Sequence, residues 1–154
     1  MPLKIPKTSK QRYISDVVAL NIHSPNGTGD WHSATTFASP LPEHLFVYGD
    51  AQPCNTNPIL GDMGIIDGTK RLNQMGIYPE HTPVFVADHP RACFDLIYTV
   101  VLQKGAVNSV ILDDWFPSTE DKQAVYAFIQ AAEPHFNSQQ KERLVKWKQK
   151  NPIQ

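Results

Sequence analysis

Four aspartates in this chain follow short apolar runs that are typical of β-strands. They are Asp50, Asp88, Asp113 and Asp114. Because the carboxyl ends of parallel strands meet at one edge of a sheet, we expect these carboxylates to lie at a common edge. Such oxygens suit Mg²⁺ or Mn²⁺, and the bound ion could orient a phosphoester and its attacking water. The pattern is therefore consistent with a divalent-metal-dependent phosphoesterase or nuclease.

The same aspartates also suit a structural role. An aspartate between a strand and a helix can accept hydrogen bonds from the free N–H groups of the first helical turn. Asp88 precedes His89 and Pro90, as a helix cap would, and Asp50 lies in a Gly-Asp turn. Capping is the simpler interpretation, and it requires no metal.

Two histidines and an acid lie close together in the sequence NIHSPNGTGDWHS, residues 21–33. His23, Asp30 and His32 could ligate a metal ion, or His32 could act as a general base oriented by Asp30. No helical spacing fixes these side chains on one face, so a binding role without metal stays open. The alternative to any such role is a tight turn that anchors neighbouring aromatic side chains.

The surrounding segment, 24–42, is dominated by Ser, Pro, Asn, Gly and Thr, which predicts a long loop. Long loops in compact domains are disproportionately functional. Trp31 in this loop and Trp115 further along each lie beside an acid, and Trp often anchors protein interfaces. We therefore expect Asp30, Trp31, His32 and Trp115 to contribute to binding.

No residue pattern indicates a catalytic nucleophile. Cys54 and Cys93 lack a local family signature or CxxC spacing, and no GxSxG occurs. A buried, reduced thiol is the usual state of such a cysteine.

Charge is segregated along the chain. Residues 13–140 hold fourteen acids and five bases, whereas residues 1–12 hold four bases and no acid. Such an acidic body repels nucleic acid and favours a basic protein partner or a metal ion.

The final helical pattern is basic, with five cations between residues 141 and 150. They are Lys141, Arg143, Lys146, Lys148 and Lys150. A solvated helix face is the ordinary interpretation. The alternative is that this helix and the basic residues 1–12 together contact nucleic-acid phosphates.

The 154 residues fit one domain, which we place at 13–154 behind a basic, mobile arm of residues 1–12. The first residues contain no apolar run of the secretory kind, and no stretch is apolar enough to span a bilayer. We expect a cytoplasmic protein with no membrane partner.

Three apolar runs, residues 45–48, 84–87 and 110–112, predict strands that are each followed by a helical pattern. A short helix or strand is expected near residues 15–22, and helices are expected from Asp67 to Gly76, from His89 to Lys104 and from Ser118 to before Pro134. A last helix over residues 138–150 completes a C-terminal helical hairpin. Alternation of strands and helices predicts an α/β fold with a short, partly parallel sheet and flanking helices. An α+β fold is the alternative.

The segment VADHPRACFDLIY, residues 86–98, resembles part of the AbiEi-type antitoxins, in which a strand leads into a helix opening on a Pro-x-Arg-Ala element. The resemblance implies a cytoplasmic protein that neutralises a nucleotidyltransferase toxin or represses its operon, with DNA bound by an N-terminal winged helix. Pro90, Arg91 and Asp95 are the matching residues, as structural members of the helix.

These observations lead to two functional hypotheses. The first is a non-enzymatic protein-binding module of the antitoxin or inhibitor kind, which engages a basic partner, such as a toxin encoded nearby, through an acidic surface. No cofactor is expected for it. The alternative is the metal-dependent phosphoesterase or nuclease, with Mg²⁺ or Mn²⁺ held by the strand-end aspartates.

Overall fold

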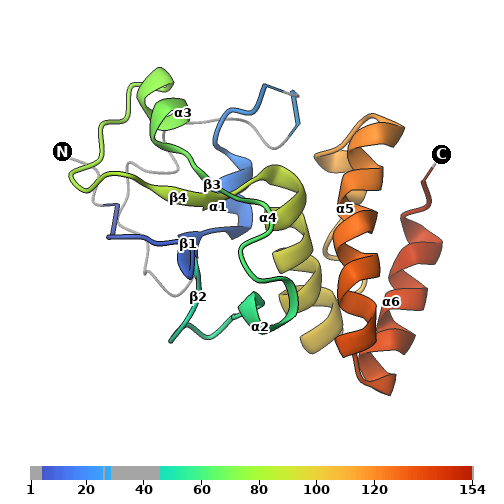
Figure 1. The fold of residues 1–154 in the computed structure, drawn as a ribbon. Coiled ribbons are helices and arrows are strands. Elements are labelled where there is room, and N and C mark those ends of the chain that lie inside the picture. Colours follow the sequence, from blue (N-terminus) through green and yellow to red (C-terminus); the bar gives the residue numbers. More distant parts are fainter. Residues whose placement is uncertain (1–4, 26, 29–45, 154) are drawn as a thin grey trace.

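A computed structural model of the protein describes residues 5–25, 27–28 and 46–153. It contains a four-stranded sheet in the order β2-β1-β4-β3 (Figure 1). The strands are β1 (Arg12–Ile14), β2 (Val47–Gly49), β3 (Ile65–Asp67) and β4 (Phe85–Ala87). The two central strands run parallel, with Ile14 opposite Val86. Each edge strand is antiparallel to its neighbour, so the sheet is mixed and the predicted α/β class is confirmed.

Helices alternate with these strands and then end the chain. They are α1 (Asp16–Leu20), α2 (Asn57–Leu60), α3 (Thr69–Gln74), α4 (His89–Leu96), α5 (Thr119–Ala132) and α6 (Ser138–Lys150). A π-helix, η3 (Ile97–Gln103), continues α4, and short 3₁₀ turns form η4 (Leu112–Asp114) and η5 (Glu133–His135). The predicted helices at residues 67–76, 89–104, 118–133 and 138–150 are confirmed, with ends that differ by a few residues. Of the two alternatives expected near residues 15–22, the helix is the one that forms, as α1.

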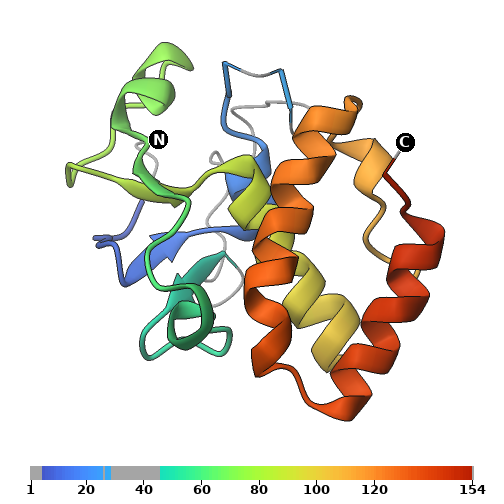
Figure 2. The ribbon, with the colours of Figure 1, turned by 45° about the vertical axis from the view of Figure 1, so that its right-hand side comes forward.

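Helix α4 with its π-helical extension lies between the sheet and the last two helices (Figures 1 and 2). It contacts α1 on the sheet side and α5 on the other, while α6 packs against η3. α5 and α6 form the predicted C-terminal hairpin, in which the rings of Tyr126 and Trp147 lie 5.9 Å apart. One continuous core results, and Phe94, Ile97 and Trp147 are completely buried in it.

The expected strand over residues 110–112 is wrong. Leu112 begins the 3₁₀ turn η4. Its backbone N–H donates to the Asn151 side chain at 2.9 Å, and the Val110 carbonyl accepts from Trp147 Nε1 at 2.9 Å. Because the end of α6 satisfies these backbone groups, Val110 and Leu112 are buried without a strand partner.

The expected mobile arm is also corrected for its described part, residues 5–12. Ile5 is only 4% exposed, and the Thr8 hydroxyl accepts a 2.8 Å hydrogen bond from the backbone N–H of Phe85. Arg12 then begins β1, a strand that the sequence analysis missed together with β3. Residues 5–12 therefore pack against the folded domain and lead into its sheet.

Among the described residues, no helix is both long enough and apolar enough to cross a membrane.

Candidate functional site

The four predicted aspartates do not converge. β2 runs antiparallel to β1, and β1 runs parallel to β4, so β2 and β4 point in opposite directions. Asp50 follows β2 and Asp88 follows β4, and the two residues therefore lie at opposite ends of the strands. Asp113 and Asp114 lie in η4, outside the sheet. Within the described ranges, no group of three or more His, Cys, Asp or Glu side chains could hold a metal ion. The expectation of a shared carboxylate edge is therefore wrong.

Three of these four acids have a local partner. Asp88 Oδ1 accepts from the backbone N–H of Arg91 at 2.9 Å, which is the predicted helix cap. Burial raises the pKa of Asp88, and the nearby charges of Arg71 and Arg91 oppose that rise. Asp50 accepts from the Asn57 amide at 3.3 Å, and Asp113 pairs with Lys122.

Asp30, Trp31 and His32 lie outside the described residues, so their predicted roles stay predictions. His23 is described and exposed. Trp115 is half-buried and packs against the core.

Most of the basic residues on α6 have contacts within the chain. Arg143 donates to the carbonyls of Leu102 and Gln103 at 2.8 and 3.0 Å, which satisfies the end of η3. Lys148 bonds Glu133 at 2.7 Å, Lys146 lies 3.7 Å from Glu142, and Lys150 bonds Asn108 at 2.6 Å. Lys141 is exposed. These contacts favour a structural role for the basic helix over phosphate binding.

The polar side chains around Asp95 form a closed cluster inside the core. One Asp95 oxygen accepts from Tyr13 and Ser15 at 2.7 and 2.8 Å, and the other accepts from Thr56 at 2.6 Å and Arg91 at 3.3 Å. Burial raises the pKa of Asp95, while the Arg91 charge and the hydroxyl donors lower it. Because both oxygens are saturated by protein donors, this cluster holds the fold together and offers nothing to a ligand.

Both cysteines are poor nucleophiles in this structure. Burial raises the pKa of Cys54 to about 12 and also raises that of Cys93. Cys54 Sγ lies 2.7 Å from the Thr99 hydroxyl. Since the thiolate is the reactive species, neither residue is poised for nucleophilic catalysis at neutral pH.

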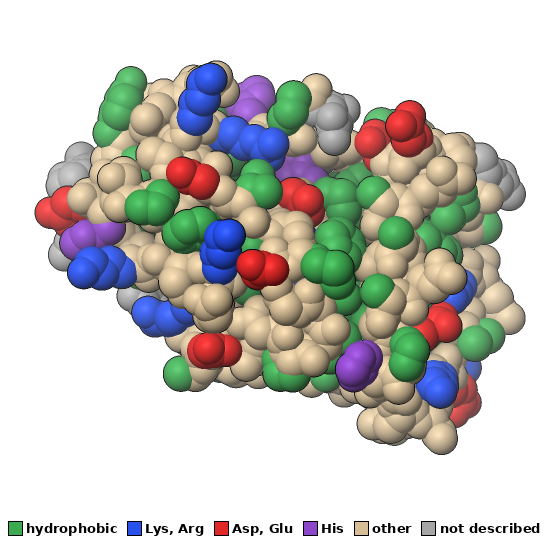
Figure 3. All heavy atoms as spheres, in the orientation of Figure 1, with side chains coloured by type: hydrophobic (Ala, Val, Ile, Leu, Met, Phe, Trp, Pro, Cys, Tyr) green, Lys and Arg blue, Asp and Glu red, His purple; other side chains and the backbone are tan. Residues whose placement is uncertain are grey.

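An acidic face forms where η4 meets the first turn of α5, and it is defined here by Asp113, Asp114, Glu120 and Asp121. Exposed acidic side chains gather there, over the top of α5 (Figure 3). Lys122 contributes a positive charge, but its side chain is only 10% exposed and pairs with Asp113. Ile111 beside the face is 47% exposed. The combination presents negative charge next to apolar surface.

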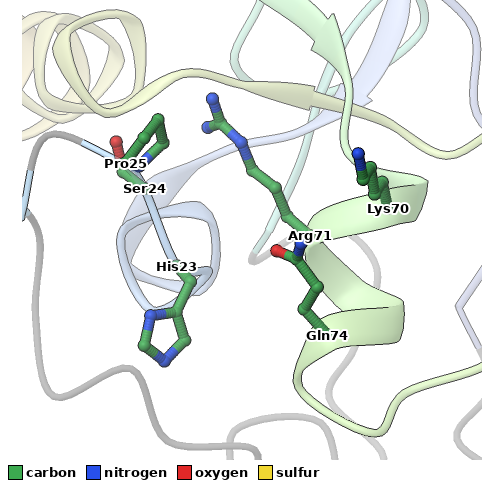
Figure 4. Close-up of a pocket in the computed structure, with 6 residues that line it drawn as sticks. All are labelled: His23, Ser24, Pro25, Lys70, Arg71 and Gln74. Carbon is green, nitrogen blue, oxygen red and sulfur yellow. The ribbon is translucent and has the colours of Figure 1, made fainter.

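A hollow of about 520 Å³ lies between the segment after α1 and helix α3 (Figure 4). Its lining residues are His23, Ser24, Pro25, Lys70, Arg71 and Gln74. Sequence reasoning singled out His23 but missed Lys70 and Arg71. The available signal was that these two adjacent cations are among only five bases between residues 13 and 140.

No protein-family model, curated protein or solved structure matches this chain. What the fold defines is a small, mixed α/β protein, and its two surface features, the acidic face and the hollow, are the candidate binding sites.

Proposed function

We propose that this protein is a non-enzymatic binding module of the antitoxin or inhibitor kind, which engages a basic protein partner in the cytoplasm. The observation that carries the proposal is the acidic face beside exposed apolar surface. A toxin encoded near its gene is the kind of partner we envisage. The metal-dependent alternative is not proposed, because the aspartates that it needs lie apart.

Buried neighbours and a helix cap fix the backbone of the acidic face. Leu112, the first residue of η4, and Phe116, which follows η4, are 1% and 0% exposed. The Ser118 hydroxyl caps α5 by accepting from the Asp121 N–H at 3.1 Å. A surface whose backbone is already ordered loses little entropy when it binds, which favours affinity.

The charge and the apolar residues of this region have separate roles in the proposed complex. Asp114, Glu120 and Asp121 make no ion pair with any described residue, and their charges create a negative potential that steers a basic partner and raises its association rate. Ile111 and the half-buried Trp115 supply apolar contact area, which favours slow dissociation once the partner is in place.

The test is a charge-matched pair of variants. The face variant D114N/E120Q/D121N leaves the Asp113–Lys122 pair intact, and the control D62N/E80Q/E142Q removes three exposed acids elsewhere. Both change the net charge equally. The partner is first identified by cross-linking to the wild-type chain in its host, and the association rate is then measured with the purified partner at low and high salt.

We expect the face variant to associate at least about tenfold more slowly at low salt, with a smaller salt dependence, as for loss of electrostatic steering. The control is expected to stay near the wild type. Equal rates for the two variants, or the absence of any specific protein partner, would contradict the proposal.

A further inference from the structure

We propose that the hollow between residues 23–25 and α3 binds a small organic phosphate of about nucleotide size. This site is separate from the acidic face and does not depend on the proposed partner. All six residues line the hollow. Arg71 and Gln74 extend from α3 on the side of His23, Ser24 and Pro25, whereas Lys70 lies at the start of α3 and does not point toward them (Figure 4).

Hydrogen bonds within the chain hold both walls of the hollow in place. The buried His89 ring bonds the Ile22 carbonyl through Nε2 and the Thr28 hydroxyl through Nδ1, each at 2.7 Å. Since a carbonyl only accepts, Nε2 carries a proton, and the ring ties residues 22–28 to the start of α4. The segment carrying His23 is therefore anchored on both sides.

The α3 wall is anchored with equal firmness. Leu72 is 0% exposed, so this helix is fixed to the core through its inner face. The Gly68 N–H donates to Val84 O at 2.7 Å, and the Thr69 hydroxyl accepts from the Val84 N–H at 2.9 Å. These bonds join the start of α3 to the residue before β4. A preformed hollow of this kind loses little free energy to ordering when a ligand enters.

The charge lining the hollow is positive. Lys70 is exposed and Arg71 is half-buried, and none of the described lining residues is acidic. The Arg71 charge also lowers the pKa of Asp88, a carboxylate that follows β4. Lys70 makes no ion pair with any described residue. The hollow therefore attracts an anion.

The donors that line the hollow suit a phosphate group. The Arg71 guanidinium presents a planar fork of N–H groups that matches phosphate oxygens, and Lys70 adds a point charge. The Gln74 amide is a neutral group that can bond a sugar or a base. Pro25 offers an apolar surface beside them.

The size of the hollow indicates an organic phosphate instead of a free inorganic ion. Its volume of about 520 Å³ is several times that of a phosphate group. Sites for small molecules span roughly 300–1,000 Å³, so the hollow has room for a ring attached to the phosphate. A nucleoside monophosphate is the simplest probe with both parts.

The experiment titrates the full chain with AMP, adenosine, inorganic phosphate and sulfate, followed by amide NMR shifts and calorimetry. We expect AMP to bind and shift residues 23–25 and 70–74, inorganic phosphate and sulfate to bind more weakly, and adenosine to bind weakest. Arg71→Gln and Lys70→Gln should each weaken AMP binding about tenfold or more, because each removes a charge-assisted contact.

Lys141→Gln, which removes an exposed cation on α6, is the matched control and should bind AMP like the wild type. Lys70 is exposed, so Lys70→Gln should keep the wild-type melting temperature even if Arg71→Gln does not. Three results would overturn the proposal: no binding at millimolar AMP, unchanged affinity in Lys70→Gln, or equal affinities for AMP and inorganic phosphate.

Discussion

Arg91 shows how a single residue can join distant parts of this chain. It is 0% exposed, yet all five of its N–H groups have acceptors within the protein. The acceptors are Asp95, the carbonyls of Gly61 and Met63, and the hydroxyls of Tyr13 and Thr56. Arg91 therefore links β1, the ends of α2 and the loop before β3 to α4. A buried charge is tolerated here because its hydrogen bonds are complete.

We predict that Arg91→Met lowers the free energy of unfolding by about 3–5 kcal/mol, because it leaves Asp95 buried without its counter-ion. Chemical denaturation followed by circular dichroism measures the change. Lys146→Met, which breaks the exposed pair with Glu142, is the control and should cost at most about 1 kcal/mol. A loss below about 1 kcal/mol for Arg91→Met would show that the cluster is not what holds these elements together.

At the scale of elements, the pairing of β1 with β2 depends on the close approach of two backbones. Gly49 has a φ of 113°, and a Cβ added to it would lie 2.0 Å from the carbonyl oxygen of Gln11. The Asp50 N–H donates to that same carbonyl at 2.8 Å. Only glycine lets the two chains come this near, so the residue fixes where the edge strand sits.

We expect Gly49→Ala to destabilise the protein by about 2–4 kcal/mol, from steric overlap and backbone strain together. Gly76→Ala is the matched control: Gly76 also has a positive φ, of 79°, but nothing lies within 4 Å of its added Cβ. It should lose only the strain, about 1 kcal/mol. Comparable losses for the two variants, measured by urea denaturation, would rule out the overlap with Gln11.

At the scale of the whole molecule, Asn151 closes the helical half of the protein. Its side chain accepts from the Leu112 N–H at 2.9 Å and donates to the Trp147 carbonyl at 2.9 Å. The Tyr126 hydroxyl donates to its backbone carbonyl at 2.5 Å. This residue therefore joins η4, helix α5 and the end of α6, and it helps to place the acidic face.

Replacing Asn151 with Ala should cost about 1–3 kcal/mol of unfolding free energy, since it leaves the Leu112 N–H buried without an acceptor. Thermal and chemical denaturation both report the loss. Gln149→Ala, an exposed neighbour in α6, should change stability by less than about 0.5 kcal/mol. Equal stability of the two variants would mean that solvent satisfies the Leu112 N–H when Asn151 is replaced. The hydrogen bond from Leu112 to Asn151 would then not be what holds the helical half together.

Local sequence determined the helical half of this protein. The Ser118 cap before α5 and the Asn137–Gln140 capping box before α6 are contacts between residues three apart, so the chain encodes them directly. The same holds for the Asp88 cap of α4 and for Gly105, whose φ of 79° follows η3.

Only the tertiary structure decided the sheet and the surface sites. Three-residue strands such as β1 and β3 show too little periodicity to be read from sequence, and they become strands because a partner lies beside them. Residues 110–112 are also a short apolar run, but their backbone groups bond to the side chains of Trp147 and Asn151 at the end of α6 instead of to a strand. Likewise, the direction of β2 separates Asp50 from Asp88, and folding brings Lys70 and Arg71 to the same hollow as His23. Pairing partners and strand directions are set by contacts between distant residues, which no local pattern contains.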